Sequence, residues 1–158
     1  MFTGIIEEKG TIKNIDKKKN LSRISIEAKL SGVLQIGDSI AVDGTCLTVV
    51  EKKSNVFIAE AIKQTLEITT LKDKKAGEIV NLETSLTLNK SLSGHIVQGH
   101  IDTVGALKAI KKLTWSLAYV NIRNPRIACL FLVGILNKST EIRDDGSLQF
   151  CFCCFHKR

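Results

Sequence analysis

The chain has 158 residues, of which 44% are hydrophobic and 25% charged, a composition that can bury a core and excludes an intrinsically disordered or collagen-like chain. The formal net charge of +7 raises the question of a nucleic-acid or membrane-surface partner. The basic residues are scattered in short runs, such as 17–19, 52–53 and 74–75, with almost no aromatic residues between them for base stacking, so we expect solvated turns and no nucleic-acid partner.

Residues 1–112 have the pattern of short strands, which alternate or run apolar and are separated by turns rich in Gly, Asn, Asp or Lys. Asp43-Gly44 predicts a tight hairpin between two of them, because both residues tolerate a positive φ. Only Lys63–Leu71 looks like a helical turn. Such a chain is expected to be all-β and to form a small antiparallel barrel or sandwich. The six predicted strands are Gly10–Ile15, Ser22–Glu27, Asp38–Val42, Cys46–Glu51, Val56–Ala61 and Ile79–Glu83.

The opening segment is repeated later in the chain. Residues 4–15 align without gaps on residues 99–110, and both glycines, an acidic position, a lysine and the apolar positions coincide. This offset of 95 residues predicts a second barrel that opens near residue 99. The hairpin at 39–48 should then recur at 134–143, but the two segments share nothing, and the composition also changes in this region. The second copy is therefore interpreted as truncated or frameshifted after about residue 113, with a divergent second domain as the alternative.

Location is inferred from apolar runs and cysteines. The longest apolar run, residues 127–136, is far shorter than the ~20 residues that a membrane-spanning helix needs. No basic segment followed by an apolar run opens the chain, so no secretory leader is expected. Cys46 stands alone in the body of the chain, and five cysteines do not make a disulfide framework. We expect a cytoplasmic protein without a membrane partner.

Five motifs together resemble riboflavin synthase of the alpha-chain type. They follow the order of that family and cover roughly residues 1–112, whereas the C-terminal part departs from it. The motifs are Met1-Phe2-Thr3-Gly4-Ile5-Ile6-Glu7, Val42-Asp43-Gly44-Thr45-Cys46-Leu47-Thr48-Val49, Gln64-Thr65-Leu66-Glu67-Ile68-Thr69-Thr70-Leu71, Gly77-Glu78-Ile79-Val80-Asn81-Leu82-Glu83 and Gly94-His95-Ile96-Val97-Gln98-Gly99-His100-Ile101-Asp102.

The resemblance implies a fold and a reaction. It implies tandem six-stranded antiparallel Greek-key β-barrels, with a first lumazine-binding barrel at 1–97 and an incomplete or divergent second one at 98–158. The implied enzyme is a transferase that converts two molecules of 6,7-dimethyl-8-ribityllumazine into riboflavin and 5-amino-6-(D-ribitylamino)uracil, the last step of riboflavin biosynthesis. It implies no metal and no cofactor, a homotrimer, and lumazine synthase as a further partner.

The resemblance also implies the positions that bind this small-molecule substrate. The backbone of 4–6 is expected to meet the pteridine ring opposite the strand 46–48, and 60–65 is expected to hold the ribityl chain and the ring edge. Residues 99–101 would be the matching edge of the second barrel. The expected substrate-binding residues are Gly4, Ile5, Ile6, Cys46, Leu47, Thr48, Glu60, Ala61, Ile62, Lys63, Gln64, Thr65, Gly99, His100 and Ile101.

Phe2, Cys46 and His100 are the expected catalytic residues, and each also has an ordinary structural interpretation. Phe2 would otherwise be strand-end packing at a fraying terminus, and Cys46 a small buried hydrophobe on an apolar strand. His95 and His100 form a two-histidine cluster without a nearby third ligand, which does not make a zinc site. The tightly spaced Cys151–Cys154 cannot readily wrap one metal ion either.

Glu7 and Glu8 are expected to be solvated.

Two rival hypotheses keep the same first barrel but assign it another function. In one, the chain is a lumazine- or flavin-binding module without turnover. In the other, it is the inactive product of a frameshifted gene. The Phe2, Cys46, Thr48, His95 and His100 positions favour the enzyme, because a carrier can dispense with acid-base groups.

Overall fold

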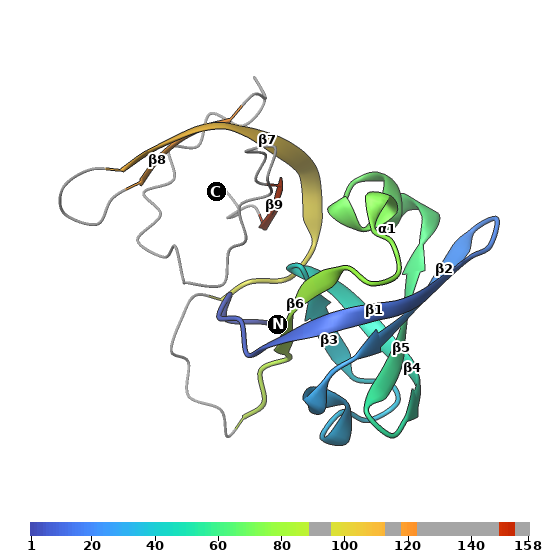
Figure 1. Cartoon of the computed structure of the whole chain (residues 1–158). Coiled ribbons are helices and arrows are strands. Elements are labelled where there is room, and N and C mark those ends of the chain that lie inside the picture. Colours follow the sequence, from blue (N-terminus) through green and yellow to red (C-terminus); the bar gives the residue numbers. More distant parts are fainter. Residues whose placement is uncertain (89–95, 113–117, 123–148, 154–158) are drawn as a thin grey trace. The chain divides into compact units, whose positions relative to one another are not determined.

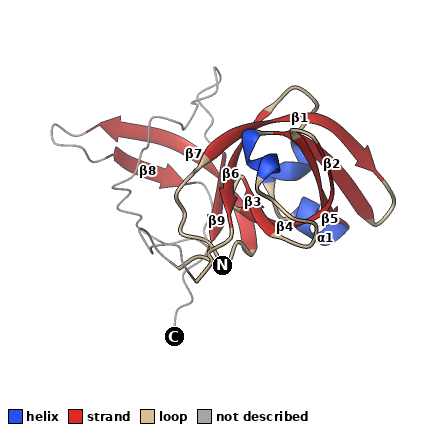
Figure 2. Ribbon diagram, turned by 90° about the horizontal axis from the view of Figure 1, so that it is seen from below, coloured by secondary structure: helices blue, strands red, loops and turns tan. Residues whose placement is uncertain are grey.

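A six-stranded barrel occupies the first half of the chain in the computed structural model, which describes residues 1–88, 96–112, 118–122 and 149–153 (Figure 1). The barrel is closed and antiparallel, with the strand order β1-β2-β5-β4-β3-β6 (Figure 2). All six predicted strands are observed, and their ends differ from the prediction by at most two residues. The strands are β1 Glu8–Lys17, β2 Leu21–Glu27, β3 Ser39–Val42, β4 Thr45–Lys53, β5 Val56–Ile62 and β6 Ile79–Thr84.

The connections between the strands explain the topology. β3, β4 and β5 form a meander, and β2 lies beside β5, which is a Greek-key arrangement. The 3-10 helix η1 (Lys29–Gly32) links β2 to β3, while α1 (Lys63–Glu67) and the 3-10 helix η2 (Thr70–Asp73) link β5 to β6. The predicted all-β class and the helical turn after the fifth strand are therefore both confirmed.

The interior of the barrel is filled by the inward-facing half of each strand. Burial alternates along β2 and β5, as expected for strands with one face in a core. Closure gives every barrel strand a neighbour on both sides, so the barrel has no unpaired edge strand. The buried side chains that form the interior cluster are Ile12, Ile24, Ile26, Ala28, Leu34, Ile40, Val42, Leu47, Val49, Phe57, Ala59, Ala61, Leu71, Val80 and Leu82.

The predicted hairpin turn is observed between β3 and β4. Asp43 and Gly44 have φ values of 48° and 80°, and Val42 pairs with Thr45 across the turn. Asp43 also connects this turn to β6, because its Oδ1 accepts a hydrogen bond from the backbone of Asn81 at 2.8 Å. The hairpin that carries Cys46 is therefore fixed at its turn as well as along its ladder.

Two charged residues expected to be solvated have structural roles instead. The Lys74 side chain is only 11% exposed, and its Nζ lies 3.0 Å from Asp43 Oδ2 and 3.7 Å from Glu78 Oε2. Glu8 accepts hydrogen bonds from the backbone of Lys29 and Leu30, each at 2.7 Å, and so caps η1. The contacts of Lys74 with Asp43 and of Glu8 with η1 are not visible in the sequence, because they join residues more than 20 positions apart.

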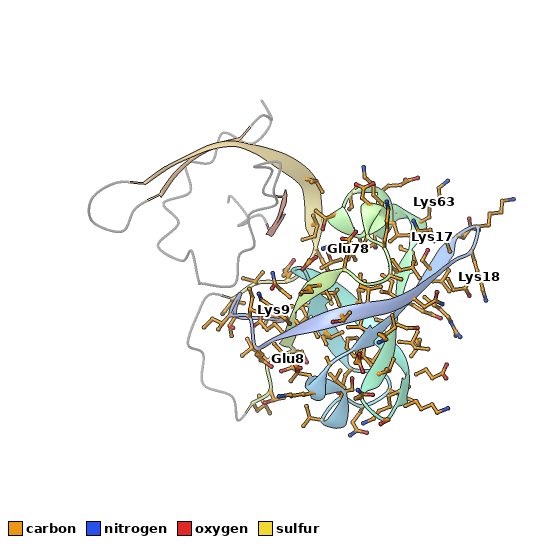
Figure 3. The ribbon with its side chains drawn as sticks, in the orientation of Figure 1. Glu8, Lys9, Lys17, Lys18, Lys63 and Glu78 are labelled. Atoms are coloured by element: carbon orange, nitrogen blue, oxygen red, sulfur yellow. The ribbon has the colours of Figure 1, made fainter. Side chains whose placement is uncertain are left out.

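The lysines of the β1–β2 ribbon are exposed, as expected. Lys17 and Lys18 lie exposed at the end of the β1–β2 ribbon (Figure 3). On the exposed surface of the same ribbon, Lys13 Nζ lies 3.1 Å from Glu27 Oε2. This hydrogen bond, together with one from Asn55, lowers the pKa of the Glu27 carboxyl.

The described strands that follow the barrel form a three-stranded sheet in the order β8-β7-β9. β7 (Ile101–Lys112) and β8 (Ala118–Ile122) are antiparallel, and β9 is Gln149–Cys153. The β7–β8 ladder has a register shift between Leu107 and Ala109, and the β1–β2 ladder has one between Ile12 and Asn14. These irregularities lie at equivalent positions of the sequence repeat. The segment 134–143, where the second hairpin was sought, lies outside the described residues.

Within the part of the chain that the structure describes, no helix combines the length and the apolar character required to cross a membrane.

Replacing Gly10 with alanine should destabilise the barrel. A Cβ there would lie 2.7 Å from Ile26 Cγ2 and 2.7 Å from Leu82 Cδ1, inside a filled core. Overpacking of this kind costs about 1–3 kcal/mol, which should lower the urea midpoint of unfolding. Gly32→Ala is the matched control, because a Cβ there meets nothing within 4 Å. Equal midpoints for the two variants would contradict this description of the core.

Candidate functional site

The candidate site is built on the outer face of the barrel. Along β4, the side chains of Leu47 and Val49 point into the core, so those of Cys46 and Thr48 point outward. The ladders align Cys46 with Ala41 on β3, and Ala41 with Glu83 on β6. Glu83, Ala41 and Cys46 thus form a row across three strands.

This row is covered, although it lies outside the barrel. Ala41 is 3% exposed and Glu83 is 6% exposed, and neither belongs to the interior cluster. Two segments outside the barrel strands provide hydrogen bonds to the row: Thr3 and Gly4 reach Glu83, and Gly99 reaches Cys46. The row and the residues that bond to it are called the outer-face cluster below; it comprises Phe2, Thr3, Gly4, Ala41, Cys46, Glu83, Val97 and Gly99.

The two covering segments are joined to each other. Phe2 donates its N–H to Val97 O at 2.7 Å, and Val97 donates to Phe2 O at 2.9 Å, which makes an antiparallel bridge. The Phe2 side chain is 1% exposed. The predicted site residues Phe2 and Gly99 are close together, since a Cβ on Gly99 would lie 3.0 Å from Phe2 Cε2.

Gly99 fits its position only because it has no side chain. Its φ is +79°, and an added Cβ would lie 2.8 Å from Cys46 Cβ. In return, its carbonyl accepts the Cys46 N–H at 2.9 Å. The ladder between β4 and β5 ends at Thr48 and Glu60, so the segment around Gly99 supplies the partner that β5 does not give to Cys46.

Glu83 fixes the N-terminal segment and was not identified from the sequence. Its Oε1 accepts the Thr3 N–H at 2.5 Å and the Thr3 hydroxyl at 2.7 Å, while its Oε2 accepts the Gly4 N–H at 3.0 Å. In the sequence, Glu83 is the polar end of an alternating strand and gives no sign of burial. Its partners are about 80 residues away, so only the structure reveals its role.

A second polar row continues the outer face. Thr48 lies opposite Glu60, and Glu60 lies opposite Arg23 across β4, β5 and β2. Arg23 Nε donates to Glu60 Oε1 at 2.9 Å, and the two side chains are 42% and 26% exposed. Arg23 was also missed in the sequence. Beyond Glu60, the predicted segment passes from the end of β5 into α1, where Lys63 and Gln64 are exposed.

The predicted residues divide into those that present a side chain and those that present only backbone. Leu47 and Ala61 belong to the interior cluster, so only their backbone groups can meet a ligand. Ile101 is buried. Exposed positions are Gly4, Ile5, Thr48, Ile62, Lys63, Gln64 and His100. Half-buried positions are Ile6, Cys46, Glu60 and Thr65. His95 lies outside the described residues.

This arrangement suits a flat, polar heterocycle better than a metal ion. It offers backbone donors and acceptors, small residues that permit close approach, and a half-buried thiol at Cys46. Within the described ranges, no three His, Cys, Asp or Glu residues are grouped as metal ligands.

Comparison with known families gives a match over the first half of the chain. Residues 3–85 match the model of the lumazine-binding domain. The riboflavin synthase of Actinobacillus pleuropneumoniae is 44% identical over 111 residues, which are 70% of this chain and 52% of that protein. The riboflavin synthase of Bacillus subtilis is 38% identical over 120 residues, or 75% and 56% of the two chains. The predicted riboflavin synthase-like segment is therefore confirmed, and the chain spans about half the length of these relatives.

Solved structures agree with the fold. The structure of LumP complexed with 6,7-dimethyl-8-(1'-D-ribityl) lumazine has a TM-score of 0.64 and 26% identity, and the match covers 80% of this chain and 67% of that one. LumP complexed with riboflavin has a TM-score of 0.67 and 27% identity, with coverages of 80% and 68%.

Gly99→Ala should release Cys46 from the outer-face cluster. The new Cβ cannot fit against Cys46, so the Cys46 N–H should lose its acceptor and its amide exchange should accelerate about tenfold or more. Gly77→Ala is the control, since its φ of +90° gives similar backbone strain while nothing lies within 4 Å of the new Cβ. Unchanged exchange at Cys46 in Gly99→Ala would show that this contact is absent in solution.

Proposed function

Because the chain belongs to the lumazine-binding domain family, we propose that the outer-face cluster binds 6,7-dimethyl-8-ribityllumazine. The observation that carries this proposal is the convergence of Phe2, Cys46 and Gly99, which come from three separate parts of the sequence. The backbone edges at 4–6 and 46–48 are proposed to meet the ring, and residues 60–65 the ribityl chain. Residues 99–101 complete the site.

The proposed activity is that of riboflavin synthase, a transferase. Two lumazines react, and a four-carbon unit passes from one to the other to give riboflavin and 5-amino-6-(D-ribitylamino)uracil. The identities of 44% and 38% to riboflavin synthases support this proposal. Fixing both rings in a reactive orientation can supply about 7–11 kcal/mol of the barrier in favourable cases.

The chemical roles follow from residue type and burial. One lumazine must lose a proton from its C7 methyl group, and the other must accept a nucleophile at its ring. His100 is exposed beside Gly99 and can exchange a proton, while the Cys46 thiol is half-buried at the covered row. Phe2 has no acid-base group, so its proposed role is to form an apolar wall of the site beside Gly99.

The complete reaction needs a second ligand position. We place the first lumazine-binding barrel at 1–97 and the second at 98–158, with a departure from the family pattern after about residue 113. The equivalent bulges in β1 and β7 support a second copy. A homotrimer, a cytoplasmic location and association with lumazine synthase complete the proposal.

Binding without turnover is the second candidate function. It is favoured by the likeness to LumP, which was solved in complexes with lumazine, riboflavin and flavin mononucleotide. In such a module the outer-face cluster would hold one ligand and no reaction partner would be positioned against it.

One experiment separates the two candidates. The full chain is titrated with 6,7-dimethyl-8-ribityllumazine while ligand fluorescence and riboflavin formation are followed. We expect saturable binding and riboflavin production well above the uncatalysed background. Binding without riboflavin would select the module, and an absence of both would overturn the proposed function.

Thr48→Val tests the outward face of β4 as part of the site. The exchange preserves side-chain shape and removes one hydroxyl, so the loss of a hydrogen bond to ligand should weaken lumazine binding by up to about tenfold. The same exchange at Thr11, on β1, is the control and should leave affinity unchanged. Equal affinities in the two variants would exclude Thr48 from the site.

A further inference from the structure

Glu83 is a buried residue whose carboxylate accepts hydrogen bonds from the N-terminal segment. Strand alternation directs Val80 and Leu82 into the core and Glu83 outward, yet Glu83 is only 6% exposed. Burial of a carboxylate is costly unless hydrogen bonds compensate. Here Thr3 and Gly4 donate all three of the hydrogen bonds described above.

The Glu83 carboxylate accepts backbone N–H groups of the N-terminal segment that a neighbouring strand would otherwise accept. Phe2 is held by the bridge to Val97, and the chain rejoins the barrel where Glu7 donates its N–H to Leu82 O at 2.9 Å. Between these points, the N–H groups of Thr3 and Gly4 point to Glu83. Thr3 Oγ1, which donates to Glu83, also accepts the Ile5 N–H at 3.2 Å. Glu83 therefore orients Thr3 and Gly4 directly and Ile5 through the Thr3 hydroxyl.

We infer that Glu83 is a positioning residue for the lumazine site: it holds the backbone of residues 3–5 in the conformation that meets the ring. The inference rests on the proposed function. Glu83 is not part of the interior cluster, so the barrel can keep its core when this anchor is lost. Its effect should therefore fall on the N-terminal segment and on ligand affinity.

The test is Glu83→Gln in the full chain, measured by lumazine titration and by amide hydrogen exchange. The amide keeps the shape of the side chain but loses its charge, and its NH2 group replaces one acceptor with a donor. We expect affinity to fall about tenfold and exchange at Thr3 and Gly4 to accelerate. Exchange at Ile24 and Ile26, in the core of β2, should stay slow.

Matched variants separate positioning from a general loss of charge or stability. Thr3→Val removes the hydroxyl that bonds to Glu83 and should weaken binding several-fold, while Thr3→Ser keeps the hydroxyl and should recover most of that loss. Glu51→Gln changes an exposed carboxylate on β4 and should bind like the unaltered chain.

Three outcomes would overturn the inference, and they are distinguishable. Unaltered affinity in Glu83→Gln, despite fast exchange at Thr3 and Gly4, would mean that the anchored segment does not meet the ligand. Fast exchange at Ile24 and Ile26 as well would show that Glu83 acts only in overall stability. Failure of the unaltered chain to bind lumazine would remove the proposed function itself.

Discussion

The filled interior of the barrel is the constraint on which the site depends. Six short strands enclose only enough space for their own side chains, and the cluster around Ile24, Ile26 and Phe57 occupies it. The proposed site therefore lies on the outer face, where strand alternation places Cys46 and Glu83. The outer face of a barrel is normally exposed to solvent, so a site there needs further residues that shield it from water. The N-terminal segment and the segment around Gly99 provide that cover.

Both covering segments are held by hydrogen bonds rather than by an extensive ladder. In the N-terminal segment, Thr3 and Gly4 donate to the carboxylate of Glu83, and in the other segment the Gly99 carbonyl accepts the Cys46 N–H. Hydrogen bonds to a charged group contribute about 1.5–3 kcal/mol each, more than neutral ones. The charge on Glu83 therefore compensates for the short contact that the N-terminal segment makes with the barrel.

Short sequence patterns were enough to predict the barrel strands and the β3–β4 hairpin. Alternation located β1–β6, and Asp43-Gly44 located the hairpin, because each signal is contained in a few adjacent residues. The roles of Glu8, Arg23, Lys74 and Glu83 were missed because each depends on a partner that is distant in the sequence and brought near by the fold. Resemblance supplied Cys46 and Gly99 as candidate site residues, but only the register showed that Leu47 and Ala61 face the core.

The sequence repeat explains why the cover extends beyond the matched domain. Phe2 and Val97 differ by the same offset of 95 residues that relates Gly4 to Gly99, and both glycines have a φ of 79°. The antiparallel bridge thus joins equivalent residues, which gives the two opening segments a local two-fold relation. The segment that opens the second copy is in this way used to cover the first barrel. The family match covers residues 3–85, so it contains Cys46 but begins one residue after Phe2 and ends before Gly99. The site proposed for the first barrel therefore includes the start of the second copy, which lies outside the family match.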